Sequence, residues 1–334
     1  VLYIIPYDRL IVYSTLFWIV LMWNQCIYVI YGRRNFTEAR VSIVREKEMY
    51  KSMFGFAGMN FIGSFSYILS TQGVNVILNI FFGVAVNAAR AIAIQVQSAV
   101  GRFVGDFMTA LNPQITKEYA STNIEQSVLL CNRGAKFSYF ITLLLTVPII
   151  IRTHEILTIW LNEYPDYSVQ FLHYTLYISL VSVLAQPFVT LLLASGKLKK
   201  TTWWIGGTRL LVLPLIYLCF KIFNSPIFAY IIVLAMDGFL FFIRLHILDS
   251  IIGLPVLKSF ITYVFRPIVI VSIISLLASY VLDLAIPDSI IGLFLFCSVS
   301  IICTAITILY LGLSYSERSI IKSYISRKIN KIRH

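Results

Sequence analysis

The sequence predicts an all-α polytopic membrane protein with about nine transmembrane helices. Hydrophobic residues make up 59% of the 334 residues and charged residues only 13%, about half the charged share of an ordinary soluble domain. The mean hydropathy is +0.84, and apolar runs long enough to cross a bilayer recur along the chain. A soluble fold could not cover so much apolar side chain with so few polar residues. This composition excludes a soluble enzyme, a disordered chain and a disulfide-rich secreted scaffold.

Nine apolar runs are candidates for helices that cross a bilayer, which takes about 20 residues. They are Leu10–Tyr31, Phe54–Phe82, Val84–Ala110, Phe137–Ile151, Val169–Ala194, Thr202–Phe223, Ile227–Ile247, Phe260–Leu282 and Ile290–Leu313. The connections between them are short, and they leave no room for a separate soluble domain. The longest connection on the side opposite to the basic loops is the predicted loop Arg152–Ser168.

Basic residues gather in every second connection. One side carries the large majority of the Lys and Arg residues, from Arg33 to Arg333, whereas the other side holds only Arg9, Arg152 and Lys221. Short cytoplasmic loops are the ones enriched in Lys and Arg. We therefore expect the N-terminus of this chain outside and its C-terminus in the cytoplasm. The net charge of +12 then reflects topology, and no nucleic-acid partner is expected.

Apart from residues at the span ends, six charged residues fall inside predicted spans, where a charge is costly and usually faces protein or water. Arg102 and Asp106 are four residues apart and can pair along one helix. Arg209 and Asp237 lie at similar depths on neighbouring antiparallel spans, which favours a structural ion pair between them. The other two are Arg90 and Arg266. Arg266 precedes Pro267 close to the cytoplasmic interface, so it either faces a cavity or extends toward the headgroups.

The third predicted span separates into a polar half and an apolar half when it is drawn at 100° per residue. The preceding span adds further amides, and the Gln186–Pro187 pair in the fifth span could face the same space. Two interpretations stay open: a hydrophilic cavity for a polar, anionic ligand, or hydrogen bonds that join helices. The candidate cavity residues are Gln72, Asn75, Asn87, Arg90, Gln95, Gln97, Arg102 and Arg266.

The sequence contains no pattern that is typical of an active site. The four His and five Cys residues lack metal-ligand or redox spacing, and neither a phosphate-binding loop nor a zinc motif is present. We therefore expect no enzymatic activity, no metal and no cofactor. The basic tail Ser316–His334 carries an apolar side, so it is predicted either to lie on anionic membrane lipids as an amphipathic helix or to be a solvated tail.

The segment Gly58–Ala120 resembles the central part of bacterial polysaccharide flippases. These are the O-antigen and capsule flippases of the MATE-like MOP superfamily, in particular those of Bacteroidota. The resemblance rests on Gln72-Gly73 with Asn75, on Asn87-Ala88-Ala89-Arg90, and on Asn112-Pro113-Gln114-Ile115. It covers about 60 residues, and the rest of the chain agrees only in hydropathy and spacing.

The resemblance implies a MATE-like fold of two helical bundles around a central cavity. Residues 1–53 would be the last helix of the first bundle with a cytoplasmic linker, residues 54–250 the second six-helix bundle, residues 251–313 two accessory helices, and residues 314–334 the basic tail. About five helices would then precede the first residue of this chain. The chain begins with Val rather than Met, which agrees with that expectation.

The resemblance also implies a function. An undecaprenyl-pyrophosphate-linked oligosaccharide would be moved across the bacterial inner membrane for O-antigen or capsule synthesis, with a polymerase and glycosyltransferases as partners. Arg90, with Arg102 or Arg266, would hold the pyrophosphate, because arginine forks match phosphate oxygens. A cation-coupled exporter of the MATE type, a peptidoglycan lipid II flippase and a membrane enzyme of the same pathway are the alternatives.

Overall fold

The computed structural model describes residues 9–36 and 46–319, and these residues form helices joined by short connections, without a strand. Eight of the helices in this part of the chain are long and apolar enough to cross a membrane. The protein is therefore an all-helical membrane protein, as the composition predicts. The chain divides into two compact units, Val1–Met53 and Phe54–His334.

The first unit contains α1 (Arg9–Asn35) and the first turns of α2. Large apolar side chains are exposed around α1; Phe17, Trp18 and Trp23 are all more than half exposed. A helix that is apolar all round suits a lipid environment.

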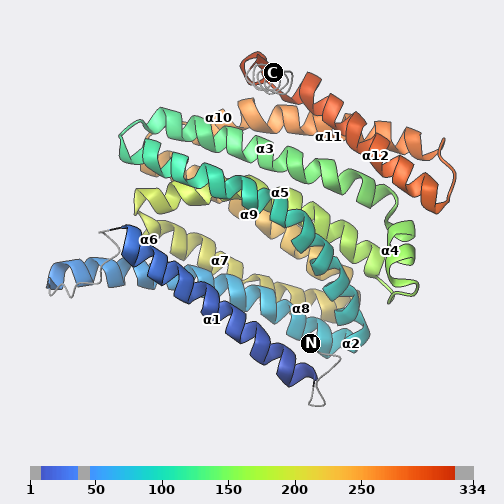
Figure 1. Ribbon diagram of the computed structural model, residues 1–334, viewed down its shortest axis with the longest axis horizontal. Coiled ribbons are helices and arrows are strands. Elements are labelled where there is room, and N and C mark those ends of the chain that lie inside the picture. The colour runs from blue at the N-terminus through green and yellow to red at the C-terminus, as the bar shows by residue number, and fades with distance from the viewer. Residues whose placement is uncertain (1–8, 37–45, 320–334) are drawn as a thin grey trace. The chain divides into compact units, whose positions relative to one another are not determined.

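Helix α2 (Lys47–Ala120) reverses direction at Gly83 and so forms two arms, drawn in blue and teal in Figure 1. Gly83 has φ 79° and ψ −173°, a conformation that only glycine adopts readily. Arg90 donates a hydrogen bond from Nε to Asn75 Oδ1, although a straight helix would hold these residues about 22 Å apart. Each arm is long enough to cross a bilayer. The nine predicted spans count these arms separately, at Phe54–Phe82 and Val84–Ala110.

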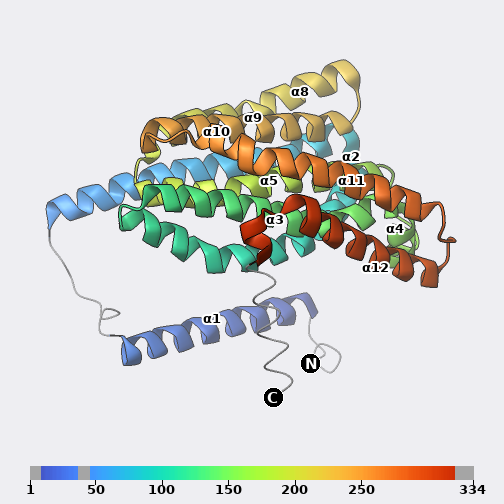
Figure 2. The ribbon, with the colours of Figure 1, turned by 90° about the horizontal axis from the view of Figure 1, so that it is seen from above.

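The remaining helices follow in chain order and lie side by side in the second unit (Figures 1 and 2). They are α3 (Ile124–Ile151), α4 (Thr153–Leu161), α5 (Ser168–Ser195), α6 (Leu198–Thr201), η2 (Thr202–Gly206), α7 (Gly207–Leu210), α8 (Val212–Phe223), α9 (Ile227–Ile252), α10 (Val256–Phe260), η3 (Ile261–Phe265), α11 (Arg266–Asp283), α12 (Ile290–Thr307) and η4 (Ile308–Gly312). The three η segments are single π-helical turns: η2 joins α6 to α7, η3 joins α10 to α11, and η4 ends the helix that begins as α12.

Two predicted boundaries differ from the structure. Helix α3 begins at Ile124, well before the predicted Phe137, because Asn132 and Lys136 are buried with polar partners instead of lying in a loop. Asn132 donates to Ser259 Oγ over 2.8 Å. The predicted loop Arg152–Ser168 contains the short helix α4. The predicted tail helix lies outside the described residues from position 320 onward.

Of three apolar clusters among the described residues, the two larger ones hold the second unit together. One packs α3, α5, α9 and α10 around Phe188, Phe241 and Phe260. The other packs the turn of α2 against α5, α8 and α9 around Phe171 and Phe220. Helices α11 and α12 pack on α3 (Figures 1 and 2). The two arms of α2, α5, α7, α8 and α9 leave a cavity between them, lined by both polar and apolar side chains.

Candidate functional site

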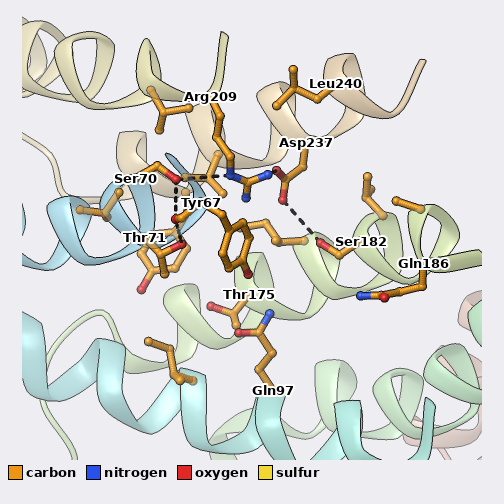
Figure 3. Close-up of a pocket in the computed structure, with 18 of the residues that line it drawn as sticks. Tyr67, Ser70, Thr71, Gln97, Thr175, Ser182, Gln186, Arg209, Asp237 and Leu240 are labelled. Atoms are coloured by element: carbon orange, nitrogen blue, oxygen red, sulfur yellow. Dashed lines mark hydrogen bonds and ion pairs between the residues drawn. The ribbon is translucent and has the colours of Figure 1, made fainter. Parts of the chain in front are cut away.

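A cavity of about 520 Å³ lies between the two arms of α2, α5, α7, α8 and α9, entirely within the second unit (Figure 3). Its polar and charged lining residues are Tyr67, Ser70, Thr71, Arg90, Gln97, Thr175, Ser182, Gln186, Arg209, Tyr230, Asp237 and Arg244. The lining has three arginines and one carboxylate, so its formal charge is positive.

Helix α9 supplies one wall through side chains at intervals of three and four residues. They are Tyr230, Val233, Asp237, Leu240 and Arg244, which fall on one helix face. The same spacing places Tyr67, Ser70, Thr71 and Val74 along the first arm of α2. Regular helices therefore position the site, with no long loop involved.

Arg209 and Asp237, the pair predicted from their depths, lie with Nη1 and Oδ1 3.1 Å apart. Arg209 also donates from Nε to Ser70 Oγ over 3.3 Å, and its guanidinium lies 4.5 Å from the centre of the Tyr67 ring. Asp237 accepts a hydrogen bond from Ser182 at 3.4 Å. Figure 3 shows Arg209 and Asp237 pointing toward one another. The pair thus ties α7 and α9 to the first arm of α2 and to α5.

Arg90 lines the same cavity from the second arm of α2. Its guanidinium carbon is 5.6 Å from the centre of the Tyr230 ring, within the range of a cation–π interaction. Its Nε hydrogen bond to Asn75 fixes the side chain at the turn of α2. Arg90 therefore has two roles: it brings positive charge to the cavity and it joins the two arms.

Amides and hydroxyls form the remaining polar lining. Gln97 donates from Nε2 to Ser179 Oγ over 3.0 Å, and Figure 3 shows Gln97 facing the cavity beside Thr175. Gln186 also lines the cavity, in agreement with the suggestion from the Gln186–Pro187 pair. Such groups can hydrogen-bond the hydroxyls of a polar ligand.

Several predicted cavity residues instead form the hydrogen bonds of the alternative interpretation. Asn75 Nδ2 donates to Gln72 Oε1 over 3.0 Å, and Asn87 Nδ2 donates to the Asn75 carbonyl over 3.3 Å. The Asn87–Asn75 and Arg90–Asn75 bonds join the two arms of α2, whereas the Asn75–Gln72 bond lies within the first arm. Gln72, Asn75 and Asn87 are not among the residues that line the cavity.

The other predicted cavity residues, Gln95, Arg102 and Arg266, are exposed and do not line the cavity. The ion pair predicted between Arg102 and Asp106 is absent from the pairs found in residues 9–36 and 46–319. Helical spacing permitted that pair, but both side chains extend outward from the second arm of α2. The exposed polar strip on this arm carries Gln95, Ser98, Arg102 and Asp106.

Arg244 and Tyr230 are lining residues that the sequence analysis missed. Arg244 counted there as one of the cytoplasmic basic residues, because it lies near the predicted end of its span. The signal that could have identified it is its spacing of seven residues from Asp237, which places both on one face of α9. Tyr230 lies seven residues before Asp237 and follows the same rule.

The site can bind an anion, and its chemistry does not suggest a resident metal. No group of three or more His, Cys, Asp or Glu side chains suited to a metal occurs in the described part of the chain.

In comparisons with protein-family models, curated proteins and solved structures, nothing matches this chain.

Proposed function

We propose that this protein is a membrane transporter that moves an anionic, hydroxyl-rich lipid-linked ligand, with the cavity as its binding site. The observation that carries the proposal is the lining of the cavity, in which Arg90, Arg209 and Arg244 accompany a single carboxylate. Arginine within a membrane helix is costly, and an anionic ligand would offset that cost. Guanidinium groups hold phosphate oxygens through paired hydrogen bonds.

The ligand that fits best is a diphosphate-linked oligosaccharide on a polyprenyl carrier, moved across the bacterial inner membrane for O-antigen or capsule synthesis. The arginines would hold the diphosphate, while Gln97, Gln186 and the hydroxyl groups of the lining would contact the sugars. The resemblance of Gly58–Ala120 to polysaccharide flippases supports this choice. A pathway polymerase and glycosyltransferases are the partners we propose, and the C-terminus would lie in the cytoplasm.

Asp237 is the observation that favours a second candidate, a cation-coupled exporter of the MATE type. A carboxylate inside a membrane cavity can bind a proton or a metal cation. Asp237 is, however, 3.1 Å from Arg209, and the lining carries more arginine than carboxylate. We therefore rank anion transport first.

The test is translocation of a fluorescent diphosphate-linked oligosaccharide by the full-length protein in proteoliposomes. Replacing Arg90 by Gln removes cavity charge, and we expect the rate to fall at least about tenfold. Arg266→Gln is the matched control, because Arg266 is exposed outside the cavity, and it should keep the wild-type rate. A second control, Asn75→Ala, removes the hydrogen-bond partner of Arg90 but keeps the charge. Equal rates for the wild type and the Arg90 variant would refute the proposal.

A further inference from the structure

Among the three arginines that line the cavity, Arg244 is the one with a buried nitrogen that makes no hydrogen bond in the described part of the chain. Its Nε is buried and makes no hydrogen bond within the part of the chain that is described, although the residue lines the cavity. Arg209, in contrast, has Asp237, Ser70 and the Tyr67 ring as partners. An unpaired buried donor is costly, and in native proteins such groups usually find a partner.

Asp237 and Arg244 lie seven residues apart on one face of α9, and both line the cavity together with Arg209. Asp237 pairs directly with Arg209, and the charges of Asp237 and Arg209 both act on Arg244. This part of the lining therefore holds two guanidinium groups and one carboxylate, and one positive charge is left over. Two adjacent cations inside a membrane repel one another unless an anion separates them.

We propose, on the basis of the function proposed above, that Asp237 is the resident counter-ion of an anion-binding seat formed by Arg209 and Arg244. A phosphate group of the ligand takes the place of the carboxylate on the two arginines. A diphosphate carries more charge and more acceptor oxygens than the carboxylate it replaces, so the exchange favours the ligand. While the cavity is empty, Asp237 offsets the desolvation of Arg209.

This arrangement also predicts that the seat prefers a diphosphate to an anion with a single negative charge. A ligand with a single negative charge gains little from displacing a carboxylate of equal charge, whereas a diphosphate gains at both arginines. Arg90 belongs to a different part of the lining, since Asn75 and the Tyr230 ring already hold it. The proposed anion-binding seat therefore lies in the part of the cavity that α7 and α9 line.

The experiment measures the affinity of inorganic diphosphate for the purified full-length protein in detergent by titration calorimetry. Asp237→Asn removes the competing charge and should bind diphosphate about tenfold more tightly than the wild type. Arg244→Gln should bind at least about tenfold more weakly. Arg244→Lys keeps the charge without the fork and should fall between Arg244→Gln and the wild type. Arg266→Gln, which changes an exposed arginine outside the cavity, should match the wild type.

If the Asp237→Asn variant does not fold, Ser182→Ala tests the same prediction. Ser182→Ala removes one hydrogen bond to Asp237 and leaves every charge in place, so a gain of about twofold to threefold in diphosphate affinity is expected. Opposite changes at positions 237 and 244 support the seat. Affinity that falls at both positions, or changes at neither, overturns it.

The two proposals fail in different ways. If diphosphate affinity shows the opposite changes but lipid-linked oligosaccharide is not translocated, the seat stands and the proposed function falls. If translocation occurs but the variants at 237 and 244 do not differ in sign, the function stands and the seat is refuted.

Discussion

At the scale of single residues, two buried cations, one in the middle of α3 and one at its C-terminal end, hold the later helices in place. Lys136 Nζ lies 2.6 Å from Glu317 Oε2, and both side chains are buried. At the C-terminal end, Arg152 contacts Asp283 at 2.7 Å and Glu155 at 3.0 Å, and also donates to the Ile286 carbonyl at 2.6 Å. In the sequence analysis, Lys136 and Arg152 served only to assign the two sides of the membrane.

Burial alone would lower the pKa of Arg152, but its hydrogen bond with Asp283 and the charges of Glu155 and Asp283 outweigh burial and raise the pKa. The guanidinium therefore stays charged, although its side chain is only 1% exposed. Its stacking over the Phe296 ring, 4.8 Å from the centre, adds a contact with α12. Arg152 thus ties α3 to the connection between α11 and α12.

The Lys136–Glu317 pair predicts a dependence of stability on pH. Burial would raise the pKa of Glu317, but the hydrogen bond from Lys136, further hydrogen bonds from Ser314 and the charge of Lys136 lower it below the ordinary value of 4.5. A lowered pKa means that the pair stabilises the fold fully above pH 4.5 and that this stability is lost as the pH falls below that value.

The check on this prediction is the thermal unfolding temperature in detergent between pH 3 and pH 6, followed by tryptophan fluorescence. Glu317→Gln should flatten the fall in unfolding temperature that the wild type shows below about pH 4.5. The exposed Glu163→Gln variant should keep the wild-type slope. An unchanged slope in the Glu317 variant would show that the pair does not contribute to stability.

At the scale of elements, the turn of α2 at Gly83 brings the motif residues together. The reversal places Asn75 beside Arg90 and Asn87, and it carries both arms past the cavity. A side chain at Gly83 would meet no atom within 4 Å. The constraint there is therefore the backbone conformation, not space.

Gly83→Ala tests this constraint. Alanine in that backbone conformation should cost about 1–3 kcal/mol of unfolding free energy. Gly105→Ala is the matched control, because Gly105 is helical and open, and it should leave stability unchanged or raise it by up to about 1 kcal/mol. Chemical denaturation in mixed micelles gives both values. Equal stability of the two variants would mean that Gly83 is not strained.

The helices were predictable from the sequence to a large extent, but the cavity was predictable only in part. Apolar runs predict spans because every backbone polar group in lipid needs an internal partner. Hydropathy alone could not extend α3 back to Ile124, because buried Asn132 and Lys136 look like loop residues until their partners are known. For the site, Arg90 and Gln97 were predicted as cavity residues and do line it.

The remaining site residues depend on which helices pack together. A helical wheel shows that a polar face exists but not what covers it, so Arg102 was predicted for a cavity from which it is absent. The spacing of Arg244 from Asp237 indicates a shared face of α9, but only the packing of the helices shows that this face lines the cavity. Such contacts depend on side-chain rotamers and on which helices lie next to one another, and spacing along one helix does not determine either.

At the scale of the whole molecule, a cationic cavity lies between helices that are held together by apolar clusters and ion pairs. Many large apolar side chains of the described helices are exposed, whereas three arginines line the cavity. Transport would then need the anionic part of the ligand to reach arginines that lie within spanning helices. We therefore expect the cavity to select for negative charge.

The most direct measurement is the thermal stabilisation of the full-length protein by a series of short polyprenyl ligands that differ only in the headgroup. At a fixed ligand concentration, a ligand that binds only the folded state raises the unfolding temperature by an amount that grows with the logarithm of its affinity. We predict that the diphosphate stabilises the protein most, the monophosphate less, and the neutral alcohol least. Equal stabilisation by all three, or the strongest effect from a cationic headgroup, would contradict selectivity for negative charge.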